Sequence, residues 1–533
     1  MPAAMDPMAT LPGGDPLILS GARSNAPFSR AEQDTIEAQR APPEIKPLRP
    51  QKERPPVADT VDQVQVLNPD SGTGESDAPP PPIPPPPTEA PPLAPPFASF
   101  RGGVDNRTTI PPDTAGAVGP GHVFNPLNNN VWIFDRAGGQ AAPVVSLNAF
   151  WNGLGIQGHT FDPRAIFDPF ERRYIFVTMA DADRPTSSLL VAASQTDDPT
   201  QGWVSHAIRV DDAAQGAVWF DFPSVGFTSD KITIQINLFT RSGSQFAGST
   251  VYAIDKKSLY DPPHQAVLQR FTLTSQGATH VPAVTYDAGF DDQFLLARWS
   301  GNIQNQGYLV VYRLSGNVAT GNATLTRVGF ITTAQTWASF PPGDIAPQTA
   351  TNELLSVGDD RLLTVCYRKG KLYACHAIML PTANPTRSAV QWFEIDTTNW
   401  NVLTLERIDD PSGNTFYSAP SLAVNSEGHV MIGHAQFAPT IHGSGSFTLR
   451  SAPASAPAPT VFAPGLNTYK RPAIFGGNSN RWGDYSHTQV DPNDTDFWTV
   501  QQFADNPVDT WATMWTKVTP PPSAPAVTPP PTA

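Results

Sequence analysis

Short hydrophobic runs dominate the chain between about residues 100 and 518. They are rich in Val, Ile, Phe, Tyr and Thr, and clusters of Gly, Asn, Asp and Pro separate them. Examples are Arg173–Thr178, Lys231–Ile236, Gly307–Tyr312 and Phe497–Val500. Long helical periods are missing, so the pattern excludes βαβ folds and predicts one large all-β domain.

A recurring unit favours a β-propeller over a sandwich, a barrel or a β-helix. Each unit has a small polar or acidic residue, a turn that often contains proline, and then two strands separated by an Asp-Gly-like turn. Pro163, Pro223 and Pro282 are spaced by 60 and 59 residues, and Pro420 follows after 138, about two repeats. Because a propeller blade repeats one meander at roughly such a spacing, we expect a propeller over 99–519, with seven blades. The units are Pro112–Val118, Phe161–Ile166, Phe220–Val225, His280–Val284, Gly358–Leu363, Ser418–Leu422 and Gly483–His487.

The two ends of the chain have a different composition. Residues 1–98 are poor in aromatics and include the run Pro79–Pro87, which predicts a disordered, extended polyproline spacer. Within it, Ser29–Glu32 has the form of a capping box and predicts a short helix over 29–40. The tail 520–533 is again rich in proline and predicted to be disordered.

Charge and hydropathy exclude two classes of partner. The formal net charge is -14 and only 34 residues are Lys or Arg, with no basic run, which argues against nucleic acid. No stretch approaches the ~18 consecutive apolar residues of a membrane span. The N-terminus lacks the basic start and apolar core of a signal peptide, so an intracellular location stays open. We expect a monomer.

The two cysteines, Cys366 and Cys375, lie in one predicted hairpin. If Lys369-Gly370 is its tight turn, Cys366 faces Tyr373, and Cys375 lies diagonally at roughly 7–8 Å, too far for an easy bridge. A shifted register would place the two thiols opposite each other. We favour two reduced thiols with no metal, and a disulfide is the alternative.

Four motifs together resemble a group of bacterial, mostly secreted, sialidase-like propeller proteins. They are Pro111–Pro120, Phe161–Arg164, Ser418–Asn425 and Asn480–Ser486, and in order they extend over most of the predicted domain. The resemblance implies a propeller fold and a surface or extracellular location. It implies no reaction, since members of this group are largely without an assigned activity and a fold does not fix a function.

Aspartates recur where the innermost strand of each blade would begin, at one mouth of the central channel. An acidic ring of this kind could bind a hard cation such as Ca²⁺ or supply a carboxylate pair for acid–base catalysis. The structural alternative, which recurrence favours, is that each Asp accepts backbone hydrogen bonds and fixes the turn into its own blade. The candidates are Asp113, Asp162, Asp221, Asp359 and Asp484.

Arginines next to the repeat units are candidate ligand-binding residues. A sialidase clamps a sugar carboxylate with arginines and uses a tyrosine nucleophile with a carboxylic acid. Tyr485 or Tyr417 could be the nucleophile, and Asp113 or Asp162 the acid. The arginines that could form the clamp are Arg164, Arg298, Arg361 and Arg481. A polysaccharide lyase would instead need a base, for which His280 is the best candidate, although a packing role is the simpler interpretation of that histidine.

The set of catalytic groups is incomplete, and this decides between the functional classes. We favour a non-catalytic recognition propeller that binds a glycan or a protein at the channel mouth. The first alternative is a carbohydrate-active enzyme, either a sialidase-like hydrolase or a lyase. The second alternative is a structural component of an envelope or particle, tethered by the proline-rich segment.

Overall fold

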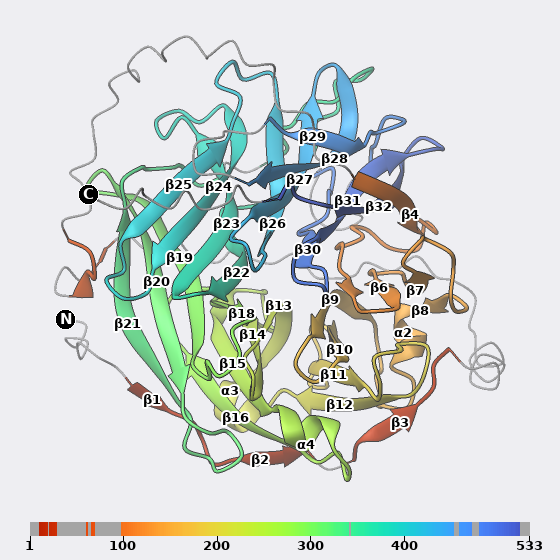
Figure 1. Cartoon of the computed structure of the whole chain (residues 1–533), viewed down its shortest axis with the longest axis vertical. Helices are drawn as coiled ribbons and strands as arrows, with labels where there is room; N and C mark the ends of the chain where they lie inside the picture. Colours follow the sequence, from red (N-terminus) through yellow and green to blue (C-terminus); the bar gives the residue numbers. More distant parts are fainter. Residues whose placement is uncertain are drawn as a thin grey trace, which may run out of the picture.

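The fold is almost entirely β. The computed structural model describes residues 10–19, 21–28, 60–61, 65–69, 97–274, 276–340, 343–451, 458–471 and 479–522. Antiparallel meanders are arranged around a central axis (Figure 1), and the chain is a β-propeller, which confirms the predicted fold class. None of the helices in the described ranges is long and apolar enough to cross a membrane. The named helices are short: α2 (Leu147–Phe150), α3 (Asp212–Gln215) and α4 (Lys256–Tyr260).

Seven meanders of four strands follow one another along the chain, and we number them in that order. The first three are β5 (Ala117–Val118), β6 (His122–Pro126), β7 (Asn130–Asp135) and β8 (Val145–Ser146); β9 (Thr160–Asp168), β10 (Arg173–Ala180), β11 (Ser188–Ser194) and β12 (Trp203–Arg209); and β13 (Val218–Phe227), β14 (Lys231–Thr240), β15 (Phe246–Asp255) and β16 (Ala266–Leu273). The fourth and fifth are β17 (Val281–Pro282), β19 (Gln293–Ile303), β20 (Gln306–Ser315) and β21 (Thr324–Thr333); and β22 (Leu362–Arg368), β23 (Lys371–Leu380), β24 (Arg387–Asp396) and β25 (Val402–Ile408). The last two are β26 (Phe416–Val424), β27 (Val430–Ala438), β28 (Ile441–Arg450) and β29 (Thr460–Ala463); and β30 (His487–Val490), β31 (Phe497–Asp505), β32 (Thr510–Val518) and β4 (Phe97–Val104).

Hydrogen-bonded pairing divides these strands into six sheets. The third and fifth meanders belong to one ten-stranded sheet, because β18 (Val284–Thr285) makes parallel pairs with both β13 and β22. The sheet count therefore does not settle the number of blades, and seven blades stays a prediction.

The first strands of successive meanders contact one another around the axis, from β9 through β13, β17, β22 and β26 to β30. The ring closes between β30 and β5, where Gln489 exchanges hydrogen bonds with the backbone of Val118. Each of the seven repeat units read from the sequence lies on one of these inner strands or leads into it. The repeat therefore located the strands that surround the channel.

The two ends of the domain meet in the seventh meander. Its inner three strands come from the C-terminal part of the chain, and β4 from the N-terminal part pairs with the outermost of them, with Phe97 opposite Val518 and Phe100 opposite Trp515. This pairing joins the first and last parts of the ring through backbone hydrogen bonds.

Part of the N-terminal segment is structured, which corrects the prediction that residues 1–98 are disordered. β1 (Thr10–Pro12) pairs with β21, β2 (Leu17–Leu19) with β16, and β3 (Arg23–Asn25) with β12, so three neighbouring meanders each gain an outer strand (Figure 1). A segment that cannot form its own core can still pair, because an exposed sheet edge supplies the hydrogen bonds. The expected helix 29–40, the run Pro79–Pro87 and the tail from residue 523 lie outside the described residues.

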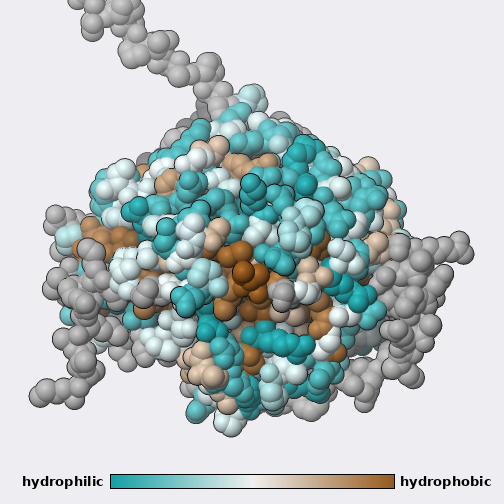
Figure 2. Space-filling view, turned by 90° about the horizontal axis from the view of Figure 1, so that it is seen from below, coloured by the Kyte–Doolittle hydropathy of each residue, from teal (hydrophilic) through white to brown (hydrophobic). Residues whose placement is uncertain are grey.

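The rim that carries these added strands is partly apolar. Seen from below, it shows a hydrophobic patch within a mainly hydrophilic surface (Figure 2). On β2, the side chains of Leu17 and Ile18 are 44% and 62% exposed.

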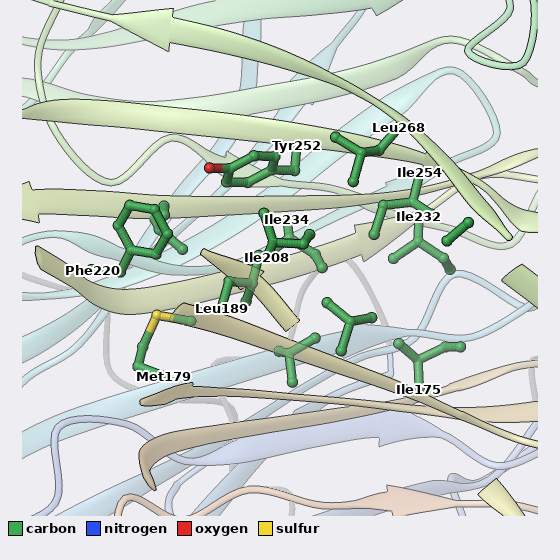
Figure 3. Close-up of a cluster of buried hydrophobic side chains, with 14 of the residues drawn as sticks. Ile175, Met179, Leu189, Ile208, Phe220, Ile232, Ile234, Tyr252, Ile254 and Leu268 are labelled. Atoms are coloured by element: carbon green, nitrogen blue, oxygen red, sulfur yellow. The ribbon is translucent and has the colours of Figure 1, made fainter. Parts of the chain in front are cut away.

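The hydrophobic core lies between neighbouring sheets. In the cluster of Figure 3, side chains from β10 to β12, such as Ile175 and Leu189, meet side chains from β13 to β16, such as Ile234 and Ile254. Large rings fill such flat contacts, and Trp151, Trp203, Trp219, Trp337, Trp498, Trp511 and Trp515 are fully buried. These tryptophans therefore pack the core and present no ring to a ligand.

The cysteine hairpin has the predicted register. Arg368 pairs with Lys371 around the turn, Cys366 lies opposite Tyr373, and Cys375 lies opposite Thr364. Both thiols are free and buried, which confirms the prediction of two reduced cysteines. Burial raises the pKa of the Cys366 thiol to about 12, so this thiol is unreactive near neutral pH.

Candidate functional site

Three inner strands have the same irregularity near the end where they begin, which we call the mouth of the channel. Two consecutive residues interrupt the pairing with the next strand: Asp162-Pro163 in β9, Phe222-Pro223 in β13 and Ala419-Pro420 in β26. The residue before each proline has a φ of 55°, 53° or 45°, in the left-handed region that is unusual before proline. A bulge of this kind changes the direction of the strand and of its side chains. The predicted proline-containing turns are thus bulges inside the inner strands.

A belt of hydrogen bonds joins neighbouring meanders around the mouth. Asp113 accepts from the Asp484 amide at 3.0 Å and from the side-chain amide of Asn128 at 2.8 Å. Asn128 in turn accepts from the Asp162 amide at 2.8 Å, and Asp162 accepts from the Phe222 amide at 3.1 Å. Asp113, Asn128 and Asp162 thus connect the seventh, first, second and third meanders in one series.

Smaller polar groups continue this belt around the channel. Asn237 on β14 donates to the hydroxyl of Thr279, just before β17, at 2.9 Å. Between the sixth and seventh meanders, Ser486 donates to the carbonyl of Ala419 at 2.8 Å. Asp113 and Asp162 thus accept backbone hydrogen bonds, as the structural interpretation expects, but from neighbouring meanders, whereas Asp359 accepts from the Arg361 amide in its own loop.

Two charged pairs at the mouth are partly exposed. Arg361 donates from Nε to Asp359 at 2.7 Å, and the two side chains are 12% and 20% exposed. Arg481 donates to Asp484 at 2.6 Å, and these side chains are 32% and 19% exposed. The two members of each ion pair belong to one short loop, two or three residues apart, and the pair presents donors and acceptors at the surface.

Aromatic rings form a floor beneath these pairs. The rings of Phe222 and Tyr485 meet edge to face with centroids 5.8 Å apart. The guanidinium carbon of Arg164 lies 3.3 Å from the Tyr485 ring centroid, and that of Arg361 lies 4.0 Å from the Phe222 centroid. With Leu363, these two rings belong to one buried hydrophobic cluster. We call the two buried rings of Phe222 and Tyr485 the floor of the mouth.

The electrostatics of the floor centre on Arg164. Burial lowers its pKa, while Tyr485, Asp162, Asp113 and Asp484 act in the opposite direction. Its Nε donates to the carbonyl of Pro223 at 3.0 Å. Of the four predicted arginines, Arg164 and Arg361 therefore contact the rings of Tyr485 and Phe222, and Arg481 pairs with Asp484, the residue before Tyr485.

Other predicted site residues are elsewhere. Arg298 pairs with Asp360 at 3.3 Å, and both side chains are buried. His280 contacts the carbonyl of Gln276 at 3.0 Å and packs edge-on against Tyr312. Burial lowers the pKa of His280 to about 4, so this histidine is neutral at pH 7.

The predicted acidic ring is only partly assembled. Asp221 is fully buried on β13, opposite Asn237, and the residue equivalent to Asp162 in that strand is its neighbour Phe222. Within the described ranges, no three His, Cys, Asp or Glu side chains are grouped so that they could hold a metal ion. The Ca²⁺ site therefore stays a prediction.

The sequence analysis missed Asn128 and Phe222. The proline alignment already placed Pro223 on Pro163, and comparing the preceding residues would have put Phe222 beside Asp162 at the mouth. Nothing in the sequence pattern distinguishes Asn128 from its neighbours Asn129 and Asn130, because its role depends on contacts with two other segments.

No family model matches the chain, and no curated protein matches it in sequence. Similar solved structures include a sialidase from Trypanosoma rangeli, at 11% identity and TM-score 0.32, covering 75% of this chain and 59% of that one. An unknown-function protein from Dyadobacter fermentans is 9% identical, with TM-score 0.36 and coverages of 68% and 96%. A GH43_1 enzyme from Xanthomonas citri is 9% identical, with TM-score 0.27 and coverages of 56% and 86%.

These neighbours have sialidase and other glycoside hydrolase folds, and at such low identity the likeness concerns the fold alone. Membership of the particular group with the four motifs stays a prediction.

Proposed function

We propose that this β-propeller binds a carbohydrate at the channel mouth, through the pairs Asp359–Arg361 and Arg481–Asp484. The observation that carries this proposal is that both pairs are partly exposed and each is confined to its own loop. Arg361 lies over the Phe222 ring of the floor, so a ligand bound to this pair would lie close to the two rings.

Sugar chemistry fits this arrangement. Each hydroxyl of a sugar both donates and accepts, and an arginine beside an aspartate supplies both functions in a fixed geometry. The buried belt of Asp113, Asn128 and Asp162 holds the surrounding loops in place, so the pairs are preorganised for binding. An extracellular or surface location, which the motif resemblance implies, would bring such a mouth into contact with glycans and remains part of the proposal.

A second candidate is a carbohydrate-active enzyme that works at the same mouth. It is favoured by three arginines near the mouth: Arg164 over Tyr485, Arg361 over Phe222, and Arg481 paired with Asp484. However, the Tyr485 side chain is 1% exposed and its hydroxyl donates to the carbonyl of Pro163 at 3.0 Å. A hydrolase of this type would have to expose that hydroxyl before it could attack a sugar.

A glycan array followed by calorimetry on the hits tests the binding proposal. Arg361→Ala and Arg481→Ala are expected to weaken binding of a hit by about tenfold or more, the equivalent of a lost charge-assisted hydrogen bond. The matched control is Arg387→Ala, because Arg387 and Asp409 form a comparable pair, each 14% exposed, on another part of the fifth meander. Repeating the titrations with calcium and with a chelator tests the predicted ion.

Two results would overturn the proposal: no glycan binds, or all three variants bind equally well. Release of reducing sugar from a hit, lost in Tyr485→Phe, would replace the binding proposal with the enzyme candidate. A protein ligand captured at the mouth, with no glycan hit, would also contradict it.

A further inference from the structure

Beneath the floor, the channel contains a small cavity. Its volume is about 60 Å³, and its wall is made by the inner strands. A single buried water needs roughly 10–15 Å³ on this measure, so the cavity has room for a few water-sized groups but not for a sugar ring. It extends from Arg164 under the floor to Phe227 and Tyr286, towards the opposite end of the channel.

The charge on the wall of this cavity is positive. Among the described residues that line it, Arg164 is the only arginine or lysine, and none is an aspartate or glutamate. The carboxylates coupled to Arg164 belong to Asp113, Asp162 and Asp484, which are absent from the lining and surround the mouth above. His487 also lines the cavity, and burial together with Arg164 lowers its pKa to about 4, which leaves it neutral at pH 7.

Two hydrogen-bonding groups of this wall have no partner among the described residues. The Nε of Arg164 donates a hydrogen bond to the carbonyl of Pro223, but the buried Nη2 donates to no acceptor among the described residues. Ser224, which follows the bulge in β13 and is 3% exposed, likewise has a buried hydroxyl without a hydrogen bond. A buried donor without an acceptor destabilises the folded chain, and a charged donor does so most. An occupant that accepts hydrogen bonds from both groups would therefore stabilise the folded chain.

We infer that the channel cavity binds a small monovalent anion, of the size of chloride or formate, between Arg164 Nη2 and the Ser224 hydroxyl. A single positive charge matches a single negative one, and the cavity has room for an anion of this size. This site is separate from the proposed sugar site, because the rings of Phe222 and Tyr485 are not part of its wall.

The test uses the full chain, first freed of small anions by exchange into isethionate, a bulkier anion. Chloride, bromide and formate are then titrated at constant ionic strength, and the melting temperature is followed. We expect each to raise the melting temperature in a saturable way, and bromide-soaked crystals to show an anomalous peak beside Arg164 Nη2. Chloride and formate as separate arms distinguish a halide site from a carboxylate site, and either result supports the inference.

Variants make the inference falsifiable. Ser224→Val removes one donor and should weaken the anion by about tenfold, and Arg164→Met should abolish binding. If Arg164→Met fails to fold, the anion affinity of Ser224→Val alone tests the inference. The matched control Arg361→Met removes an arginine above the floor and should keep the full anion response.

The inference is overturned if the melting temperature is the same in isethionate and in chloride and no bromide peak is found, because the cavity then holds water only. An unchanged anion affinity in Ser224→Val would overturn it as well. Sugar binding should be unaffected by Ser224→Val, so failure of this inference and failure of the proposed function are distinguishable.

Discussion

Ion pairs at the two ends of the channel join different parts of the fold. At the mouth, the exposed pairs Asp359–Arg361 and Arg481–Asp484 are each confined to one loop. At the far end, ion pairs join different meanders: Arg136 with Asp491, Arg368 with Asp494, and Lys256 with Asp168. The far end is therefore held together by charge, whereas the mouth is held by the buried belt.

This difference separates stability from recognition. At the mouth, Asp113, Asn128 and Asp162 supply the contacts between meanders and are at most 3% exposed, so the exposed pairs are not needed to close the ring. At the far end, removing one member of a pair takes away an ion pair between two meanders. Charged residues at the mouth are consequently the better candidates for binding a ligand.

The largest effect is expected from Asp168→Ala at the far end. Asp168 and Lys256 are 2.8 Å apart and 0% and 3% exposed, and the substitution leaves the ammonium buried without its partner. We expect a loss of about 3–5 kcal/mol in the free energy of unfolding, measured by urea denaturation. Asp197→Ala, in the exposed pair with Arg172, is the control and should cost less than about 1 kcal/mol. Equal losses in the two variants would contradict the comparison.

A smaller loss is expected from Asp162→Ala in the belt at the mouth. The substitution leaves the Phe222 amide without its acceptor and places alanine at a φ of 55°, so we expect a loss of about 1–3 kcal/mol. Asp162→Asn keeps an acceptor oxygen and tolerates this φ, and it should lose clearly less. If both variants match the wild-type chain in urea, the belt does not hold the mouth together.

Acid sensitivity at the mouth is expected to come partly from His434, which lies opposite the bulge in β26. Burial lowers its pKa to about 4, below the unfolded value of about 6.5, so the unfolded chain binds the proton more strongly. Its contribution to stability is intact above about pH 6.5 and is lost as the pH falls towards 4, by about 2 kcal/mol at pH 5. In His434→Gln, the loss between pH 7.5 and pH 5 should be smaller by about this amount in urea denaturation. An identical pH profile in both proteins would exclude this contribution.

The smallest effect on stability is expected from Arg361→Ala. Its pair with Asp359 is local and partly exposed, so the free energy of unfolding should change by less than about 1 kcal/mol, while glycan affinity falls. Denaturation and calorimetry on the same preparation separate the two effects. A loss of stability as large as that of Asp168→Ala would mean that the mouth is held together like the far end.

How far the sequence could predict the molecule differs between the fold and the site. The repeat units located every inner strand, and the hairpin with Lys369-Gly370 predicted the register of Cys366 and Cys375. The recurrence of Asp in the repeat units placed Asp221 in the acidic ring, although Phe222 occupies the position equivalent to Asp162 in the bulge. A pattern with a period of two cannot show a two-residue bulge, because the bulge changes the face on which the following side chains lie.

The sequence by itself determined the all-β composition, the inner strands and the cysteine hairpin, because hydrophobic alternation and turn residues act over short distances along the chain. Only the tertiary structure decided which distant segments meet. The strands β1 to β3 pair with the rim, Arg298 pairs with Asp360 away from the mouth, and Arg164 lies on the Tyr485 ring. These contacts join segments far apart in sequence, and their partners are fixed only when the sheets close around the axis. The mouth aspartates recur in the sequence, but which of them are buried between meanders and which are partly exposed is decided only when the ring closes.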